Sequence, residues 1–222
     1  MAEASKDASE KWLAEDSGAH YSGARFANER ARERDVRAVL ALIDATHTSF
    51  PLARVLDVPC GSGRLSRALA ARARRYVGAD VSTAMLAAAQ HALTEAGPQA
   101  SSLIADGRKL PFPAGAFDLV VACRWLHHLH GEQTLQRAIS ELTRVSRGVV
   151  IASFWDECSL PGWRRSMGLK GSEGPTGRRA LSRAEIARCF DLAGADVIGW
   201  RATLRFVSQQ TFVAARVRAK YP

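Results

Sequence analysis

The chain has 222 residues, of which 47% are hydrophobic and 24% charged, and its formal net charge is +9. This length and composition predict one soluble globular domain with a sizeable core. No run reaches the roughly 18 apolar residues of a membrane span, and the charged N-terminal segment, residues 1–16, lacks the apolar centre of a secretory signal. The four cysteines are scattered, without metal-ligand or disulfide-framework spacing. We therefore expect a cytoplasmic protein without a membrane span.

Arginine carries most of the positive charge, because lysine occurs only five times. A basic surface favours a phosphate-bearing partner such as RNA. Two groups of arginines have a simpler interpretation, as the polar side of one amphipathic helix and as a solvated helix face that alternates with acids. The first group is Arg64, Arg67, Arg72, Arg74 and Arg75, and the second is Arg30, Arg32, Arg34 and Arg37. RNA is therefore the less favoured partner, and the oligomeric state stays open.

The N-terminal part predicts a tail followed by a helical segment. Residues 1–8 are expected to be disordered, and residues 9–45 to be helical. Pro51 lies just beyond the end of this segment, where proline commonly stops a helix. We expect residues 9–49 to form a helical lid and residues 50–222 to form the main domain.

Strand and helix patterns then alternate along the chain. The predicted strands are Arg54–Val58, Arg75–Ala79, Ser101–Ala105, Phe117–Cys123, Gly148–Phe154, Asp196–Leu204 and Thr211–Val217, and the predicted helices are Arg64–Arg74, Ser82–Ala96, Glu132–Val145 and Ser182–Ala193. Residues 156–180 are rich in glycine and proline and predict a surface insertion. The alternation predicts an α/β three-layer sandwich with a seven-stranded, mostly parallel, Rossmann-like sheet. The last strand follows its neighbour without a helix, so we expect it to be antiparallel.

A loop of small residues follows the first predicted strand, in the run Val55–Leu65 (VLDVPCGSGRL). Glycine has no Cβ, so the backbone of such a loop can approach a ligand closely. The third glycine of a dinucleotide-binding loop is missing, and so is the G-K-[S/T] ending of a phosphate loop. Asp57 would repel a phosphate but attract a cation. The loop therefore predicts a cationic ligand.

Two further acids end the next two strands. Asp80 follows the second strand and could accept hydrogen bonds from both hydroxyls of a ribose, and Asp106 follows the third and could accept from an exocyclic amino group such as that of adenine. A single acid at such a position commonly caps a turn or a helix. Three of them in register beside a glycine loop favour one nucleoside site at the carboxyl edge of the sheet.

Three segments resemble the successive signatures of class I S-adenosylmethionine-dependent methyltransferases: Val55–Leu65, Val77–Leu86 and Ala105–Val121. The likeness is greatest to the small-molecule branch that includes the ubiquinone and menaquinone biosynthesis enzymes, and it covers residues 50–155. It implies S-adenosylmethionine as cofactor and methyl transfer to oxygen or carbon of a quinone-like, phenolic or other apolar small molecule. The alternatives are a tRNA or rRNA methyltransferase and a non-catalytic regulatory protein that binds the same cofactor.

The resemblance also implies which residues bind the cofactor. They are Asp57, Pro59, Gly61, Gly63, Asp80, Val81, Met85, Asp106, Gly107 and Cys123. Asp57 and the Cys123 carbonyl would face the methionine amino group, Asp80 the ribose hydroxyls, and Asp106 the adenine edge. Pro59 departs from the family, which most often has glycine there, and proline fixes φ and removes an N–H donor.

His128 and, as a weaker candidate, His127 could act as a general base for the acceptor. Both follow the fourth strand, and histidine titrates near neutral pH. A base helps when the acceptor is a hydroxyl and is dispensable for an activated carbon. The alternative is that these histidines cap or pack an ordinary strand-to-helix turn. No carboxylate cluster accompanies them, so no metal is expected.

Four residues are candidates for substrate contact: Tyr21, Arg25, Trp125 and Trp155. Tyr21 and Arg25 belong to the predicted lid, while the two tryptophans are expected at the mouth of the cleft, where a flat acceptor could stack. The alternative is that these aromatic side chains only cover the sheet.

Overall fold

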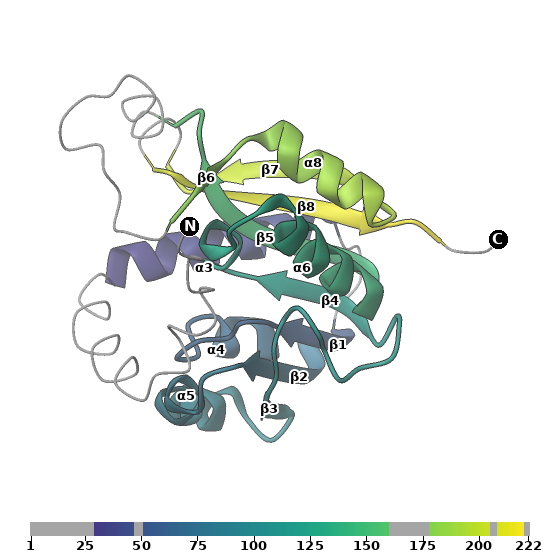
Figure 1. Cartoon of the computed structure of the whole chain (residues 1–222). Coiled ribbons are helices and arrows are strands. Elements are labelled where there is room, and N and C mark those ends of the chain that lie inside the picture. The colour runs from purple at the N-terminus through teal and green to yellow at the C-terminus, as the bar shows by residue number, and fades with distance from the viewer. Residues whose placement is uncertain (1–28, 47–50, 160–177, 205–207, 220–222) are drawn as a thin grey trace, which may run out of the picture.

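The computed structural model describes residues 29–46, 51–159, 178–204 and 208–219. These residues form a three-layer sandwich in which helices cover both faces of one twisted sheet (Figure 1). Within these ranges no helix is both long enough and apolar enough to cross a bilayer. The predicted disordered tail and the lid residues Tyr21 and Arg25 lie outside the described residues.

The sheet has the strand order β3-β2-β1-β4-β5-β8-β7. Its strands are β1 (Leu52–Asp57), β2 (Ala73–Asp80), β3 (Ala100–Ile104), β4 (Phe117–Ala122), β5 (Ser146–Asp156), β7 (Ala195–Ala202) and β8 (Gln210–Val217). The first five strands of this order are parallel, and β8 runs antiparallel to both β5 and β7. The predicted sheet, mostly parallel with an antiparallel last strand, is confirmed. The strand order reverses between β1 and β4, the position at which open α/β sheets bind ligands.

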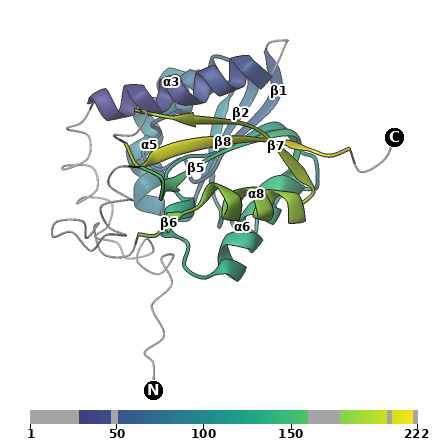
Figure 2. The same ribbon diagram turned by 90° about the horizontal axis from the view of Figure 1, so that it is seen from above.

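The helices divide between the two faces of the sheet. They are α3 (Glu29–Thr46), α4 (Ser66–Ala70), α5 (Thr83–Ala96), α6 (Glu132–Val145) and α8 (Arg183–Leu192), with a short 3-10 helix, η1 (Leu126–His128). The apolar sides of α3, α4 and α5 share one core with the sheet, and those of α6 and α8 share another. Figure 2 shows α3 on one side of the sheet and α6 and α8 on the other. The central strands are nearly continuous apolar runs because helices bury both of their faces.

The predicted helix Arg64–Arg74 is wrong in its length. The helix α4 covers only Ser66–Ala70, and the chain enters β2 at Ala73, which pairs with Leu52 of β1. The alanines and arginines that follow α4 favour a helix, but pairing with β1 outweighs this local propensity. Arg74 and Arg75 are therefore exposed strand residues and not part of a helix face.

The predicted insertion over residues 156–180 begins and ends in the sheet. Its first residue, Asp156, is the last of β5, and its last residue begins a short strand, β6 (Ala180–Leu181), which pairs with Trp155 and Asp156. This eighth strand was not expected from the sequence. Residues 160–177 lie outside the described residues.

Candidate functional site

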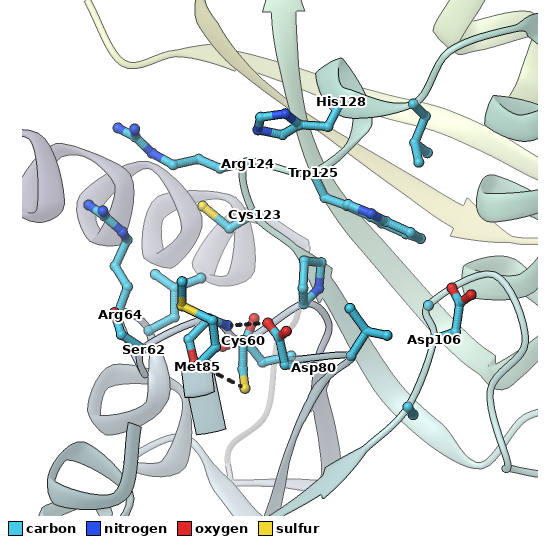
Figure 3. Close-up of a pocket in the computed structure, with 18 residues that line it drawn as sticks. Cys60, Ser62, Arg64, Asp80, Met85, Asp106, Cys123, Arg124, Trp125 and His128 are labelled. Atoms are coloured by element: carbon cyan, nitrogen blue, oxygen red, sulfur yellow. Dashed lines mark hydrogen bonds between the residues drawn. The ribbon is translucent and has the colours of Figure 1, made fainter. Parts of the chain in front are cut away.

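A pocket opens at the carboxyl ends of β1, β2 and β4, at the reversal of the strand order (Figure 3). Its lining residues are Asp57, Pro59, Cys60, Gly61, Ser62, Arg64, Leu65, Asp80, Val81, Met85, Ala105, Asp106, Gly107, Cys123, Arg124, Trp125, His128 and Leu129. All cofactor residues expected from the sequence are in this set except Gly63. Segments far apart in the chain, from Asp57 to Leu129, meet here because parallel strands end at the same edge of the sheet.

The two glycines of the first loop have different structural roles. Gly61 has a φ of +54°, and a Cβ built on it would meet nothing within 4 Å, so its Cα faces open space. Gly63 has a φ of +80°, and a Cβ there would lie 2.8 Å from the Cβ of Ala92 on α5. Gly63 therefore permits close packing of the loop on α5, while Gly61 leaves room in the pocket. Pro59 follows a cis peptide bond to Val58.

Asp57 is almost completely buried, and only one of its carboxylate oxygens has a partner. Its Oδ2 accepts a hydrogen bond of 3.0 Å from the Tyr76 hydroxyl, and its buried Oδ1 accepts none. Burial raises the pKa of Asp57 from 3.8 to about 7, with the Tyr76 hydrogen bond opposing this rise and Asp80 adding to it. A buried carboxylate oxygen without a donor is costly, so this atom suits a cationic N–H group. Tyr76, which also bonds Ser66 Oγ at 2.8 Å, gave no signal in the sequence beyond its place in an apolar strand.

Asp80 is held by the backbone on both sides. Its Oδ1 accepts from the Ser82 N–H and its Oδ2 from the Gly61 N–H, each at 2.9 Å. Burial raises the pKa of Asp80, against the effect of these hydrogen bonds. An ionised carboxylate offers about four acceptor sites, so each oxygen can still accept one ligand hydroxyl. The structure thus places a rigid pair of acceptors in the middle of the pocket (Figure 3).

The Asp106 carboxylate forms a bidentate ion pair with Arg108, with nitrogen–oxygen distances of 2.7–3.1 Å. Although burial acts in the opposite direction, the hydrogen bonds and charge of Arg108 hold the pKa of Asp106 below its usual range. A ligand amino group must therefore share this carboxylate with Arg108. Beside it, the Trp125 ring lies so close to Gly107 that a Cβ there would be 2.6 Å from the ring.

The other end of the pocket is lined by two arginines that the sequence analysis did not select as site residues. Arg64 and Arg124 both form ion pairs with Asp35 of α3, which is 1% exposed. Asp35 lies in a run of alternating charges that predicts only a solvated helix face. No local pattern indicates that it is buried against two loops that follow it by 29 and 89 positions.

His128 lines the pocket, whereas His127 is buried behind it. The two imidazole rings lie 4.4 Å apart, and His127 stacks on Trp155 at 4.9 Å with an angle of 9° between the rings. The guanidinium of Arg178 lies 5.0 Å from the centre of the Trp155 ring. Trp155 does not line the pocket, so it is placed to support the histidines. Within the described ranges no group of three or more His, Cys, Asp or Glu side chains could hold a metal ion.

Two buried thiols complete the walls of the pocket. Burial raises the pKa of both Cys60 and Cys123 far above the usual range of a thiol, with nearby acids adding to the rise. Both side chains are therefore neutral at physiological pH. They act as small apolar surfaces and not as nucleophiles.

The part of the chain that forms the pocket is similar in sequence to known methyltransferases. Residues 55–148 match a family described as a methyltransferase domain. Over 98 residues the chain is 34% identical to a ubiquinone/menaquinone biosynthesis C-methyltransferase of Bordetella parapertussis, an alignment that covers 43% of this chain and 37% of that protein. The chain thus spans less than half the length of the curated relatives it matches.

Solved structures share the fold over most of the chain. Magnesium protoporphyrin IX methyltransferase from Synechocystis PCC 6803, crystallised with bound S-adenosylhomocysteine, aligns with a TM-score of 0.71 at 21% identity over 86% of both chains. The [4+2]-cyclase SpnF aligns with a TM-score of 0.65 at 19% identity, over 82% of this chain and 81% of its own. The chain therefore shares the Rossmann-like fold of these structures, and residues 55–148 are similar to a methyltransferase domain. The same fold also occurs in a cyclase, so the chemistry must be argued from the site.

Proposed function

We propose that this chain, with its methyltransferase domain of class I fold, is an enzyme that binds S-adenosylmethionine and transfers the methyl group to a small molecule. The observation that carries the proposal is the buried Oδ1 of Asp57, which has no donor and lies beside a pocket with space at Gly61. The ammonium group of the cofactor supplies such a donor. Asp80 would hold the ribose hydroxyls, and Gly107 and Asp106 the adenine.

The residues of the chain would promote methyl transfer mainly by positioning the cofactor and the acceptor. When bound, the cofactor supplies an electrophilic methyl group on a sulfonium. The loops after β1, β2 and β4 would hold the ligand in one orientation, and the neutral thiols of Cys60 and Cys123 would exclude water from its sulfur end. Alignment of reacting groups can lower a barrier by about 7–11 kcal/mol in favourable cases. For a carbon acceptor that is already activated, this alignment would be the main contribution of the chain.

We propose an oxygen or carbon atom of a quinone-like, phenolic or other apolar compound as the acceptor. His128 borders the pocket and would accept the proton of a hydroxyl acceptor, with His127 behind it. Trp125 supplies an aromatic wall. Tyr21 and Arg25 stay proposals as substrate contacts. Trp155, which does not line the pocket, would touch the acceptor only if the acceptor extends beyond the pocket. The similarity to a C-methyltransferase of quinone biosynthesis supports a carbon acceptor.

The test has two stages. Isothermal titration with S-adenosylhomocysteine should detect binding, and an absence of binding would refute the proposal. The protein is then incubated with methyl-labelled cofactor and a cell extract, and the label is followed into small molecules, lipids and RNA. Label in a small molecule supports the proposal, whereas binding without transfer favours a regulatory protein.

An RNA acceptor is the second candidate because of the net charge of +9. Label that enters RNA, together with RNA binding that weakens steeply as salt increases, would favour it.

A further inference from the structure

Four exposed arginines lie at the edge of the sheet where its parallel strands begin, opposite the pocket (Figure 1). Arg54 of β1 and Arg75 of β2 are register partners, so their side chains leave the same face of the sheet from strands about 4.8 Å apart. Arg74 precedes Arg75 on β2 and therefore lies on the other face, and Arg147 is the second residue of β5. We call these four arginines the basic edge.

The positive charge of the basic edge is only partly neutralised. The side chains of Arg54, Arg74 and Arg75 form no hydrogen bond or ion pair with any residue that the structure describes. Asp118 of β4 lies beside Arg54, but both of its oxygens are engaged. Its Oδ1 accepts from Nε of Arg147 at 2.7 Å, and its Oδ2 accepts from the backbone N–H of Arg54 at 2.8 Å. Four guanidiniums thus face one carboxylate at this edge.

The register of Arg54 and Arg75 is unfavourable for the free protein. Like charges directly opposite each other on paired strands destabilise a sheet. An anion that lies across both strands would remove this repulsion, because each guanidinium presents a planar fork of N–H donors that matches a phosphate. The basic edge extends over β2, β1, β4 and β5, so it fits a row of phosphates better than a single one.

The surroundings of the basic edge distinguish between polyanions. Within the described residues the exposed large apolar side chains are Ile104, Leu192, Ile198 and Leu204, and none of them belongs to β1, β2, β4 or β5. The edge therefore lacks the apolar side chains that insert into a membrane surface. It also lacks the exposed aromatic rings on which the bases of a single strand stack. A duplex, which presents its phosphates on the outside, needs neither.

The sheet separates the basic edge from the pocket. Arg54 precedes Asp57 by three positions and Arg75 precedes Asp80 by five, which is about 10 Å and about 17 Å along the strands. No residue of the basic edge lines the pocket. A duplex bound at the basic edge therefore leaves the pocket open, and it is a partner of the protein and not its methyl acceptor.

We infer that the basic edge binds the phosphate backbone of a duplex nucleic acid without reading its base sequence. This inference goes beyond the proposed function and is independent of it, since the two sites share no residue. It also gives a role to Arg74 and Arg75, which the sequence analysis assigned to the polar side of a helix.

Fluorescence anisotropy with short labelled duplexes of RNA and of DNA tests the inference. The unmodified protein should bind at least one duplex, with equal affinity for two different base sequences and with an affinity that falls steeply between about 50 and 200 mM salt. The double variant Arg54→Gln and Arg75→Gln should weaken binding about tenfold or more. It should also reduce the slope of log affinity against log salt by about 2, since each lost phosphate contact removes about 0.9. The tighter of the two duplexes identifies the kind of partner.

The matched control is the double variant Arg137→Gln and Arg201→Gln. It removes the same number of charges from exposed side chains of α6 and β7, which also have no described partner, and its affinity should stay within about twofold. Both double variants should bind S-adenosylhomocysteine as the unmodified protein does, which shows that they are folded. Arg74→Gln provides a further single variant, which should lower the slope by about 1.

Four results would overturn the inference. They are an absence of duplex binding at about 50 mM salt, an equal loss of affinity in both double variants, binding to vesicles of anionic lipid but to neither duplex, and transfer of the labelled methyl group to the bound duplex. Failure of the unmodified protein to bind S-adenosylhomocysteine would instead refute the proposed function and leave this inference in place.

Discussion

Replacement of Asp57 by asparagine should stabilise the protein at alkaline pH and weaken its binding of S-adenosylhomocysteine. Asp57 is buried, and its Oδ1 has no donor, so its ionised form is unfavourable in the folded protein without ligand. Asparagine has nearly the same shape, carries no charge and can still accept from the Tyr76 hydroxyl. Its amide cannot attract an ammonium group as a carboxylate does.

The expected magnitude follows from the pKa of Asp57, which burial raises from 3.8 to about 7. The unfolded chain loses this proton above about pH 4, while the folded chain keeps it up to about pH 7. The free energy of unfolding therefore falls as pH rises between these two values. Below and above them Asp57 adds no further pH dependence, and the loss is complete above about pH 7. At about 1.4 kcal/mol for each pKa unit, the full loss is roughly 4 kcal/mol, of which about 2–3 kcal/mol falls between pH 5 and pH 8.

Urea unfolding of the unmodified protein and of Asp57→Asn at pH 5 and pH 8 measures this effect. The advantage of the variant should grow by about 2–3 kcal/mol between the two pH values, since all other titrating groups are common to both proteins. Asp44→Asn is the control, because the Asp44 side chain is 55% exposed and its removal should change little at either pH. An advantage of equal size at both pH values, or a variant less stable than the unmodified protein at pH 8, would refute the reasoning.

Three further substitutions test neighbouring parts of the site. Asp80→Ala should weaken binding of S-adenosylhomocysteine about tenfold or more in titration calorimetry, since two hydroxyls lose a charged acceptor; unchanged affinity would refute the proposed ribose contact. Gly63→Ala should lower the free energy of unfolding by about 1–3 kcal/mol, because its φ is +80° and the new Cβ would lie 2.8 Å from that of Ala92; urea unfolding without a shift would contradict this. Tyr76→Phe removes the only described donor to Asp57. Urea unfolding should show that the free energy of unfolding falls by about 1–3 kcal/mol at pH 8 and by less at pH 5, where Asp57 is protonated. An equal fall at both pH values would argue against an ionised Asp57 at pH 8.

The mostly parallel sheet and the place of the pocket could be predicted from local patterns. Apolar runs that end in Asp57 and Asp80 identify parallel strands, because such strands are buried on both faces and their carboxyl ends share an edge. The glycine loop and the two acids therefore indicated the lining of the pocket before any contact was known. The length of α4 could not be predicted in this way, because pairing with β1 decides where β2 begins.

The sequence by itself determined the alternation of strands and helices, the glycine loop and the acids at the strand ends, since each depends on residues close together in the chain. Only the tertiary structure decided the charge arrangement inside the pocket. It buries Asp35 between Arg64 and Arg124, and it leaves one oxygen of Asp57 without a donor. Burial and pairing depend on which segments pack together, and the energy of a charge depends on both. The pattern of charges in the pocket is thus a property of the folded chain.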